Sequence, residues 1–545
     1  MANKRLSTLM ALIAILAMLV AACGDGGTGA DDGDATTTTA APDDGSDTNP
    51  PDTTEAPDAS TGGELIVALS TEPNSIYLPN AAERNATNVS VQMFEGPVWI
   101  DDDNEIQPAL ATDWEISEDG LTYTFTLREN VVFHNGDVMD ADDWVASHAA
   151  AIDEANVYAY LYQTATSVTA VDPMTVEITV AAPDALFLRT LAEWAILPAS
   201  QYEAEGLAGI EANPIGTGPF AFVSWDRGDR IVLEAHTEYW DEGKPKVDRV
   251  IFRPIPDSST RLAAVQTGEV HIAQRFNSEE AATLENAPGV NVVTYPVDRV
   301  YYIAFNNMTT GVGLPTEDPQ VRVAMNHAVD RQAIVDSLFD GQAALATNLI
   351  STSSLGHDTS IEPYEYNPEL AMQMLADAGY PDGFEIGFAC PTGAYANFEE
   401  VCQAVAGYLE AVGITLEGGE IQFMESGQYW DLEAQKQLPP LFGDSWSSTI
   451  SESIERLQGA LGGADADYSS WSDPVILDLL ARIPTTLDDD ERAALYTELH
   501  RYTYENPPFI YLYEPFAFEG VNEAVQNYKP RAAENYFLKD VSLAG

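Results

Sequence analysis

Segments with strand-like and helix-like patterns alternate along most of this chain, in two successive blocks. The first block begins with the strand-like residues 63–70, continues through a hairpin-like pair at 118–137, and closes with a strand, a helix and a strand over 249–273. The second block begins with the strand-like 299–307 and closes with the strand-like 507–515. Such alternation predicts an α/β fold with two lobes, and proteins of this kind often bind ligands between their lobes.

Length and composition agree with more than one folded domain. The chain has 545 residues, of which 45% are apolar and 10% aromatic. A chain of this length exceeds what one ordinary hydrophobic core contains, so two or three domains are expected. The apolar content is high enough to exclude a disordered chain, despite the large net charge.

The N-terminus has the features of an export signal. Lys4 and Arg5 precede an apolar run from about Leu6, and small residues lead to Cys23. The run is too short for a membrane-spanning helix, so residues 1–22 are expected to be a signal peptide. Val20 to Cys23 resembles a bacterial lipobox, in which Cys23 becomes the lipidated first residue of the mature protein. The alternative is ordinary signal cleavage, with no modification of Cys23.

The segment after Cys23 is expected to be a tether. Residues 24–61 are rich in Gly, Asp, Thr and Pro and contain no basic or large apolar residue, so they cannot build a core. Residues 23–61 would therefore join a lipid to the folded body. These observations predict a protein anchored to the outer face of the cytoplasmic membrane, in the cell envelope.

The net charge of −63 limits the possible partners. Binding of nucleic acid needs Lys and Arg side chains to neutralise phosphates, so no nucleic-acid partner is expected. The same charge repels anionic lipid headgroups, which leaves the lipid anchor as the expected contact with the membrane.

Two cysteines remain in the body, Cys390 and Cys402. In an exported chain, two cysteines twelve positions apart indicate a disulfide, and two buried thiols are the alternative. The few cysteines and seven scattered histidines do not have the spacing of a metal site, so neither a metal nor a cofactor is expected.

Four stretches in a fixed order carry a resemblance to a known family. They are residues 93–137, 213–255, 304–331 and 369–385. Together they resemble the extracytoplasmic solute-binding proteins of the peptide/nickel type (family 5), the ligand-capturing subunits of ABC importers. The resemblance covers the body from about residue 63 to 545.

The resemblance implies a type II periplasmic-binding-protein-like fold, with two lobes and an additional inserted domain. Crossovers between the lobes are then expected near Asn306 and Tyr511. The implied parts are domain I at 62–98, 213–310 and 511–545, domain II at 99–212, and domain III at 311–510.

The resemblance also places a ligand-facing segment within 438–459. Peptide-binding members have a Trp followed three residues later by an Asp that pairs with the α-amino group of the peptide. Here Trp446 matches the Trp, but Thr449 stands where the Asp would be. Because a buried ammonium needs a counter-charge, either Asp444 or Glu452 supplies it or the ligand carries no ammonium there. A solute would stack on Trp446, and the hydroxyl groups of three neighbours would hydrogen-bond it: Ser445, Ser447 and Thr449.

Other ligand-facing candidates follow from position. The loop at 80–88 matches a ligand-facing loop of the family, which makes Glu83, Arg84 and Asn85 candidates. Arg84 could hold a ligand carboxylate with two hydrogen bonds, and the alternative is an ordinary salt bridge in a solvated loop. Tyr160 is the candidate from the inserted domain.

An enzyme is not expected. Gly443-Asp444-Ser445 is how some secreted hydrolases present a nucleophile, but no histidine follows an Asp at the spacing that those hydrolases use. The sequence thus predicts a lipid-anchored monomer that captures a solute, in first place a peptide, for an ABC permease and its ATPase subunits. The alternatives are an oligosaccharide or a metal chelate as the solute, or a secreted hydrolase.

Overall fold

The computed structural model describes residues 59–60, 62–81, 83–102, 104–156, 159–395, 397–448, 452–466 and 468–544. Within them, no helix is both long enough and apolar enough to cross a membrane. The predicted signal peptide, most of the tether and Cys23 lie outside the described residues.

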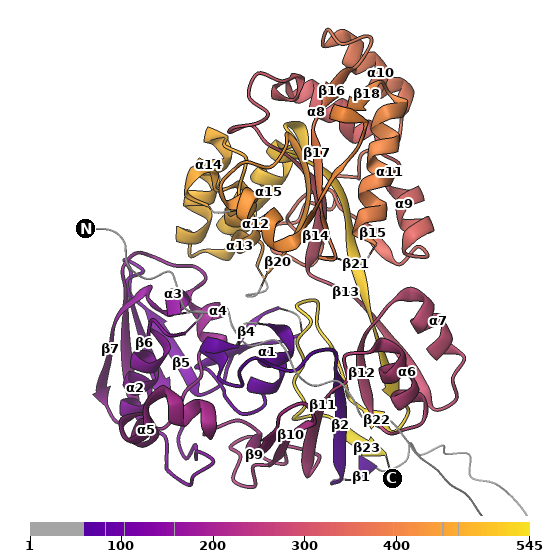
Figure 1. Ribbon diagram of the computed structural model, residues 1–545. Coiled ribbons are helices and arrows are strands. Elements are labelled where there is room, and N and C mark those ends of the chain that lie inside the picture. Colours follow the sequence, from indigo (N-terminus) through magenta and orange to yellow (C-terminus); the bar gives the residue numbers. More distant parts are fainter. Residues whose placement is uncertain are drawn as a thin grey trace, which may run out of the picture. The chain divides into compact units, whose positions relative to one another are not determined.

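The largest element is a mixed sheet of twelve strands, most of them in the order β19-β17-β20-β14-β21-β12-β2-β11-β10-β9, with β13 and β15 also paired to β21 (Figure 1). Its strands are β2 (Glu64–Leu69), β9 (Phe220–Asp226), β10 (Arg230–Ala235), β11 (Arg249–Pro254), β12 (Ile272–Phe276), β13 (Val290–Pro296), β14 (Arg299–Phe305), β15 (Ala343–Leu345), β17 (Phe388–Thr392), β19 (Gln422–Glu425), β20 (Leu441–Ser447) and β21 (Phe509–Asn522).

Strand β21 joins the two halves of this sheet. Its first part pairs with β14, where Tyr513 lies opposite Tyr301, and its last part pairs with β13 from Phe516 onward. Strands β13 and β14 are separated only by Val297 and Asp298. The pairing therefore changes at these two short segments, whereas the crossovers expected near Asn306 and Tyr511 fall beside or within the pairing of β14. The three domain boundaries drawn from the sequence stay a prediction.

Four smaller sheets complete the strands. They are β5 (Ala111–Ile116), β6 (Thr122–Leu127), β8 (Thr175–Val180) and β7 (Ala165–Asp172); β1 (Ala59–Ser60), β23 (Ser542–Ala544) and β22 (Val525–Gln526); β16 (Phe384–Ile386) and β18 (Ile414–Leu416); and β3 (Val98–Ile100) and β4 (Ile106–Pro108).

The pattern at 118–137 was partly misread from the sequence. Tyr123, Phe125 and Leu127 are buried on one face of β6, as their two-residue period predicts. The predicted hairpin with the following residues is wrong, because β6 pairs with β5 and β8 instead. Val131 and Phe133 are buried without forming a named strand, so apolar spacing alone did not identify the partner of β6.

The helices are α1 (Arg84–Ser90), α2 (Ala141–Ala151), α3 (Ala159–Tyr162), α4 (Phe187–Ala192), α5 (Ala199–Ala212), α6 (Ser258–Gln266), α7 (Ser278–Glu285), α8 (Pro319–Ala328), α9 (Arg331–Leu338), α10 (Pro368–Asp377), α11 (Phe398–Ala411), α12 (Ser426–Ala434), α13 (Ile454–Leu461), α14 (Pro474–Arg482) and α15 (Asp489–Glu505). Three of them begin in the same way: α8, α10 and α14 have Pro at the first helical position and a side-chain cap from Asp318, Asn367 and Asp473. Proline has no N–H to leave unpaired there, and the Asp or Asn oxygen accepts a hydrogen bond from a free backbone N–H.

Separate apolar cores hold these elements. One core packs the β14 half of the large sheet against its helices, with α9 and α11 on one side of β17 and α14 and α15 on the other (Figure 1). Another lies under the sheet of β5 to β8, where the rings of Trp144 and Trp194 meet edge to face at 5.8 Å. Both rings are buried, and each contributes about 3 kcal/mol by leaving water. In the first core, Cys390 and Cys402 are joined in a disulfide.

Candidate functional site

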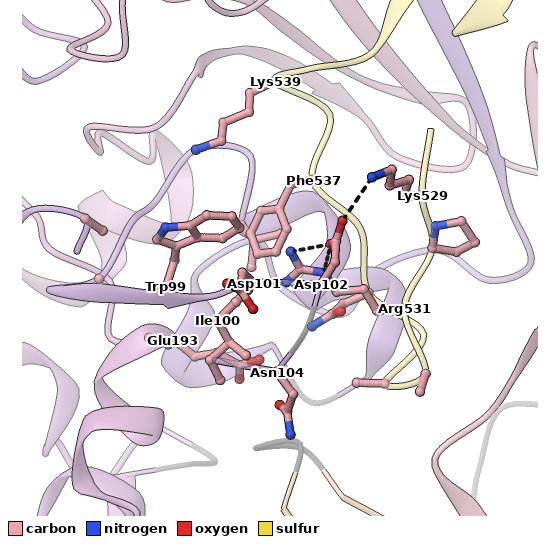
Figure 2. Close-up of a pocket in the computed structure, with 18 of the residues that line it drawn as sticks. Trp99, Ile100, Asp101, Asp102, Asn104, Glu193, Lys529, Arg531, Phe537 and Lys539 are labelled. Atoms are coloured by element: carbon pink, nitrogen blue, oxygen red, sulfur yellow. Dashed lines mark hydrogen bonds and ion pairs between the residues drawn. The ribbon is translucent and has the colours of Figure 1, made fainter. Parts of the chain in front are cut away.

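Two adjoining cavities are the candidate site. The larger cavity, about 660 Å³, is lined by residues of segment 91–104, the end of α4, strand β13 and segment 528–539 (Figure 2). The smaller cavity, about 270 Å³, is lined by residues of α1, the β13–β14 connection, the end of β20 and segment 532–534. Glu193, Asp298, Ala532 and Ala533 line both, so the cavities share part of their walls.

Three arginines line the smaller cavity: Arg84, Arg275 and Arg299. Arg275 is 3.5 Å from Glu534 and is therefore neutralised. Arg299 donates to two hydroxyl groups, at 2.8 Å to Ser445 Oγ and 3.1 Å to Ser447 Oγ. Hydroxyl groups hold the guanidinium in place without cancelling its charge.

Arg84 has no protein partner within the part of the chain that the structure describes. Neither an ion pair nor a hydrogen bond joins its guanidinium to another described residue, although it lines the smaller cavity. In a chain with only 24 Lys and Arg against 87 Asp and Glu, an arginine without a carboxylate partner is notable. With Arg299, it gives the smaller cavity two cations that could receive an anionic group.

The acidic residues of the smaller cavity are mostly engaged elsewhere. Asp298 forms an ion pair with Arg456, and Glu83 caps α1 by accepting hydrogen bonds from the backbone N–H groups of Asn85 and Ala86. Glu193 differs: among the described residues, nothing donates a hydrogen bond or forms an ion pair with its carboxyl group. Burial raises the pKa of Glu193, and the positive charge of Arg84 opposes that rise.

The predicted loop at 83–85 contributes unequally to the site. Glu83 and Arg84 both line the smaller cavity. Asn85 is buried, and its amide donates to Thr71 Oγ1 at 2.7 Å and to Ser70 Oγ at 3.2 Å. These bonds tie α1 to the end of β2, so the Asn85 side chain has a structural role.

Strand β20 separates two residues that the sequence placed together. Ser445 and Ser447 share the strand face that contacts Arg299, and Ser447 lines the smaller cavity. Trp446 points to the other face, as the two-residue period of a strand requires. Its ring packs against Gly459 of α13, where an added Cβ would come within 2.5 Å of the indole, and against Tyr468 at 6.0 Å between centroids. Trp446 lines neither of the two cavities, and Thr449 lies outside the described residues.

Asp444 is buried behind the site. Its carboxylate accepts hydrogen bonds from Tyr302 Oη at 3.2 Å and Tyr395 Oη at 3.1 Å. Burial raises the pKa of Asp444 to about 6. Burial and the charge of Asp444 also raise the pKa of the neighbouring Glu433. Asp444 belongs to this interior cluster and lines neither cavity, so it does not replace the missing counter-charge for an ammonium there.

Glu452 is buried as well, and its charge is already balanced. Arg189 Nε lies 3.2 Å from one oxygen, and Arg492 Nε lies 3.0 Å from the other. Tyr496 Oη donates to the second oxygen at 2.8 Å. A carboxylate held between two guanidinium groups has little charge left for a ligand, so Glu452 does not fill that role either.

The helix α3 contributes Tyr162 to the smaller cavity, and Tyr162 Oη donates to the backbone oxygen of Glu193 at 3.0 Å. The backbone of the predicted Tyr160 belongs to the same helix, but its side chain is not among the described parts of the structure.

Aromatic rings form much of the larger cavity. Trp99 and Phe537 meet edge to face at 6.3 Å, and both are drawn in Figure 2. Trp240 is held by a hydrogen bond from its Nε1 to Glu95 Oε2 at 2.9 Å. The Lys539 ammonium lies 5.0 Å from the centroid of Trp99 and 5.8 Å from that of Trp240, within the range of cation–π attraction. Sequence analysis missed all four residues.

The geometry around Ser445 does not resemble that of an activated nucleophile. Its Oγ accepts a hydrogen bond from the Arg299 guanidinium. A guanidinium cannot take a proton from a hydroxyl group, because it is always protonated in proteins. Ser445 therefore acts here as a support for Arg299.

Comparison with known proteins places the chain in a family. The family model "Bacterial extracellular solute-binding proteins, family 5 Middle" matches residues 105–467. The glutathione-binding protein GsiB of Salmonella paratyphi A is 30% identical over 466 residues, which cover 82% of this chain and 88% of that protein.

Solved structures agree in fold. HbpA2 from Haemophilus parasuis has a TM-score of 0.80 and 28% identity, over 88% of this chain and 100% of that one. The periplasmic binding protein DppA from Helicobacter pylori, in complex with the peptide STSA, has a TM-score of 0.71 and 25% identity, over 89% and 99%. The fold is that of the type II periplasmic binding proteins, which confirms the prediction from the sequence. The chain belongs to the bacterial extracellular solute-binding proteins of family 5.

Proposed function

We propose that this protein captures a peptide in the two adjoining cavities and delivers it to the permease of an ABC importer. It would do so outside the cytoplasmic membrane, as a monomer anchored through lipidated Cys23, without chemistry of its own. The relatives support a peptide as the solute, because one is named for binding glutathione and another holds the peptide STSA.

The observation that carries the proposal is the pair of cations in the smaller cavity. Arg84 has no partner among the described residues, and Arg299 is held by hydroxyl groups alone. Keeping two such charges beside each other is unfavourable unless an anion joins them. A peptide carboxylate supplies that anion and accepts the charge-assisted hydrogen bonds that guanidinium groups form well.

The remaining charge in the site suits the other end of a peptide. Glu193 lines both cavities, and its raised pKa shows that the carboxylate lacks stabilisation. An ammonium group beside it would supply the missing counter-charge. In this proposal Glu193 replaces the family Asp whose place is taken by Thr449. A neutral oligosaccharide would use neither the arginines nor Glu193.

The test is calorimetric titration of the tripeptide Ala-Ala-Ala into three proteins. These are the wild type, Arg84→Gln and the control Arg230→Gln, which removes an arginine that lines neither cavity and pairs with its neighbour Asp229. The Arg84 variant should raise Kd by about tenfold or more, because a charge-assisted hydrogen bond is lost, while the control stays near the wild type. Equal affinity of Arg84→Gln and wild type would contradict the proposed carboxylate site.

A further inference from the structure

The larger cavity is the main space for a solute in this site. Ligand pockets have volumes of about 300–1,000 Å³. At about 660 Å³ the larger cavity falls within that range, whereas the smaller one, at about 270 Å³, falls just below it. The smaller cavity therefore suits one charged end group, and the body of the solute needs the larger cavity beside it.

The polar groups of the larger cavity are already occupied by protein partners. Glu95 accepts hydrogen bonds from Tyr239 Oη at 2.6 Å and Trp240 Nε1 at 2.9 Å. Arg531 and Lys529 are paired with Asp102, as Figure 2 shows. These groups have little capacity left for a ligand, so the surface offered to a solute consists chiefly of rings and aliphatic side chains.

The aromatic walls are held in place before a solute arrives. Phe537 supports Trp99 from its edge, and the Arg531 guanidinium lies 4.7 Å from the centroid of Phe537. The hydrogen bond to Glu95 fixes the ring of Trp240. Walls fixed in this way lose little conformational entropy on binding, so the apolar contact contributes more of its free energy to affinity.

One polar atom of the cavity is left without a partner. Asn535 lines the larger cavity, and its side-chain oxygen is buried with no hydrogen-bond donor among the described residues. A buried acceptor without a donor is unfavourable, and a peptide N–H is the donor that a peptide solute would bring.

From these observations we infer that the larger cavity is an aromatic side-chain subsite, which selects peptides with a bulky aromatic residue next to their charged end. The inference rests on the proposed peptide function and adds the class of peptide. The carboxylate would lie between Arg84 and Arg299, and the aromatic side chain would reach Trp99, Trp240 and Phe537 past the shared wall at Ala532 and Ala533.

The experiment compares two tripeptides, Ala-Phe-Ala and Ala-Ala-Ala, by calorimetric titration. The wild type should bind Ala-Phe-Ala at least about tenfold more tightly, as burial of an aromatic side chain permits. Trp99→Ala should reduce that ratio to within about threefold, and Trp225→Ala should keep it. Trp225 is a matched control, since it stacks with Arg227 at 3.3 Å and lines neither cavity.

Each outcome decides between the proposals. If the wild type binds both peptides equally well, the aromatic subsite is wrong and the peptide function stands. If Trp99→Ala keeps the full preference, the subsite lies elsewhere and the inference is likewise wrong. If neither peptide binds, the proposed function fails and this inference fails with it. The wild-type comparison needs no variant, so misfolding of Trp99→Ala would not prevent the test.

Discussion

Arg189 of α4 forms a buried ion pair with Glu452, with 3.2 Å between Nε and Oε2. Arg189 also donates to the side-chain and backbone oxygens of Asn104, at 3.0 and 2.9 Å. The second oxygen of Glu452 is shared by Arg492 and Tyr496. Two segments far apart in the sequence are thus connected through one carboxylate, which is only 1% exposed.

Glu452→Gln should destabilise the protein without changing peptide affinity. The variant leaves two buried guanidinium groups without their counter-charge, which costs about 3 kcal/mol of unfolding free energy. The measurement is the thermal midpoint and the Kd for Ala-Ala-Ala, with the exposed Glu491→Gln as the control of equal chemistry. A weaker Kd in a folded Glu452→Gln protein would instead support a role for Glu452 in holding the ammonium.

Glu193→Gln should weaken binding only of peptides that carry a free ammonium. The uncharged amide cannot neutralise an ammonium, so Kd for Ala-Ala-Ala should rise by about tenfold, in keeping with a charged hydrogen bond. Kd for N-acetyl-Ala-Ala-Ala should stay as in the wild type. An equal loss for both peptides would show that Glu193 supports the cavity wall and does not recognise the amino group.

Glu514 should make stability depend on pH. It lies in β21 where the pairing changes, is 2% exposed, and accepts a hydrogen bond from Thr352 Oγ1 at 2.9 Å. Burial raises the pKa of Glu514 to about 7. Because the folded state holds the proton more tightly than the unfolded one, this stabilisation is present below the ordinary pKa near 4.5. It is lost as the pH rises through about 7.

The check is denaturant unfolding of wild type and Glu514→Gln at several pH values between 4 and 8. From pH 4.5 to pH 8, the wild type should lose up to about 3 kcal/mol more unfolding free energy than the variant. Parallel pH curves for the two proteins would mean that the carboxyl group titrates alike in the folded and unfolded states.

Trp446→Ala should lower stability more than affinity. The ring packs on Gly459 of α13, on the strand face opposite Ser447, so its removal leaves a gap that costs about 2 kcal/mol. Kd for Ala-Ala-Ala should change less than in Arg84→Gln. A loss of affinity as large as that of Arg84→Gln would favour the prediction that the indole stacks on the solute.

The sequence predicted the fold well because the features it rests on are local. Two-residue and helical periods marked most elements, and four stretches in order indicated the family. The partner of β6 could not be predicted, because strand pairing depends on residues far along the chain that period alone does not identify.

The site was harder to predict, since its members come from distant segments. Arg84 stood out because arginine is scarce in this chain, and it lines the smaller cavity. Glu193 and Arg299 had no local signal, because their roles depend on the absence of a carboxylate or cationic partner in space. Trp446 was grouped with Ser445 and Ser447 by proximity in sequence, although neighbours in a strand face opposite ways.

The most direct test of the central claim is a comparison of Ala-Ala-Ala with its C-terminal amide, which differs only in the carboxylate. If Arg84 and Arg299 receive that carboxylate, the wild type should bind the acid at least about tenfold more tightly than the amide. Arg84→Gln should lose much of this difference. Equal affinity of the wild type for the acid and the amide would contradict the account.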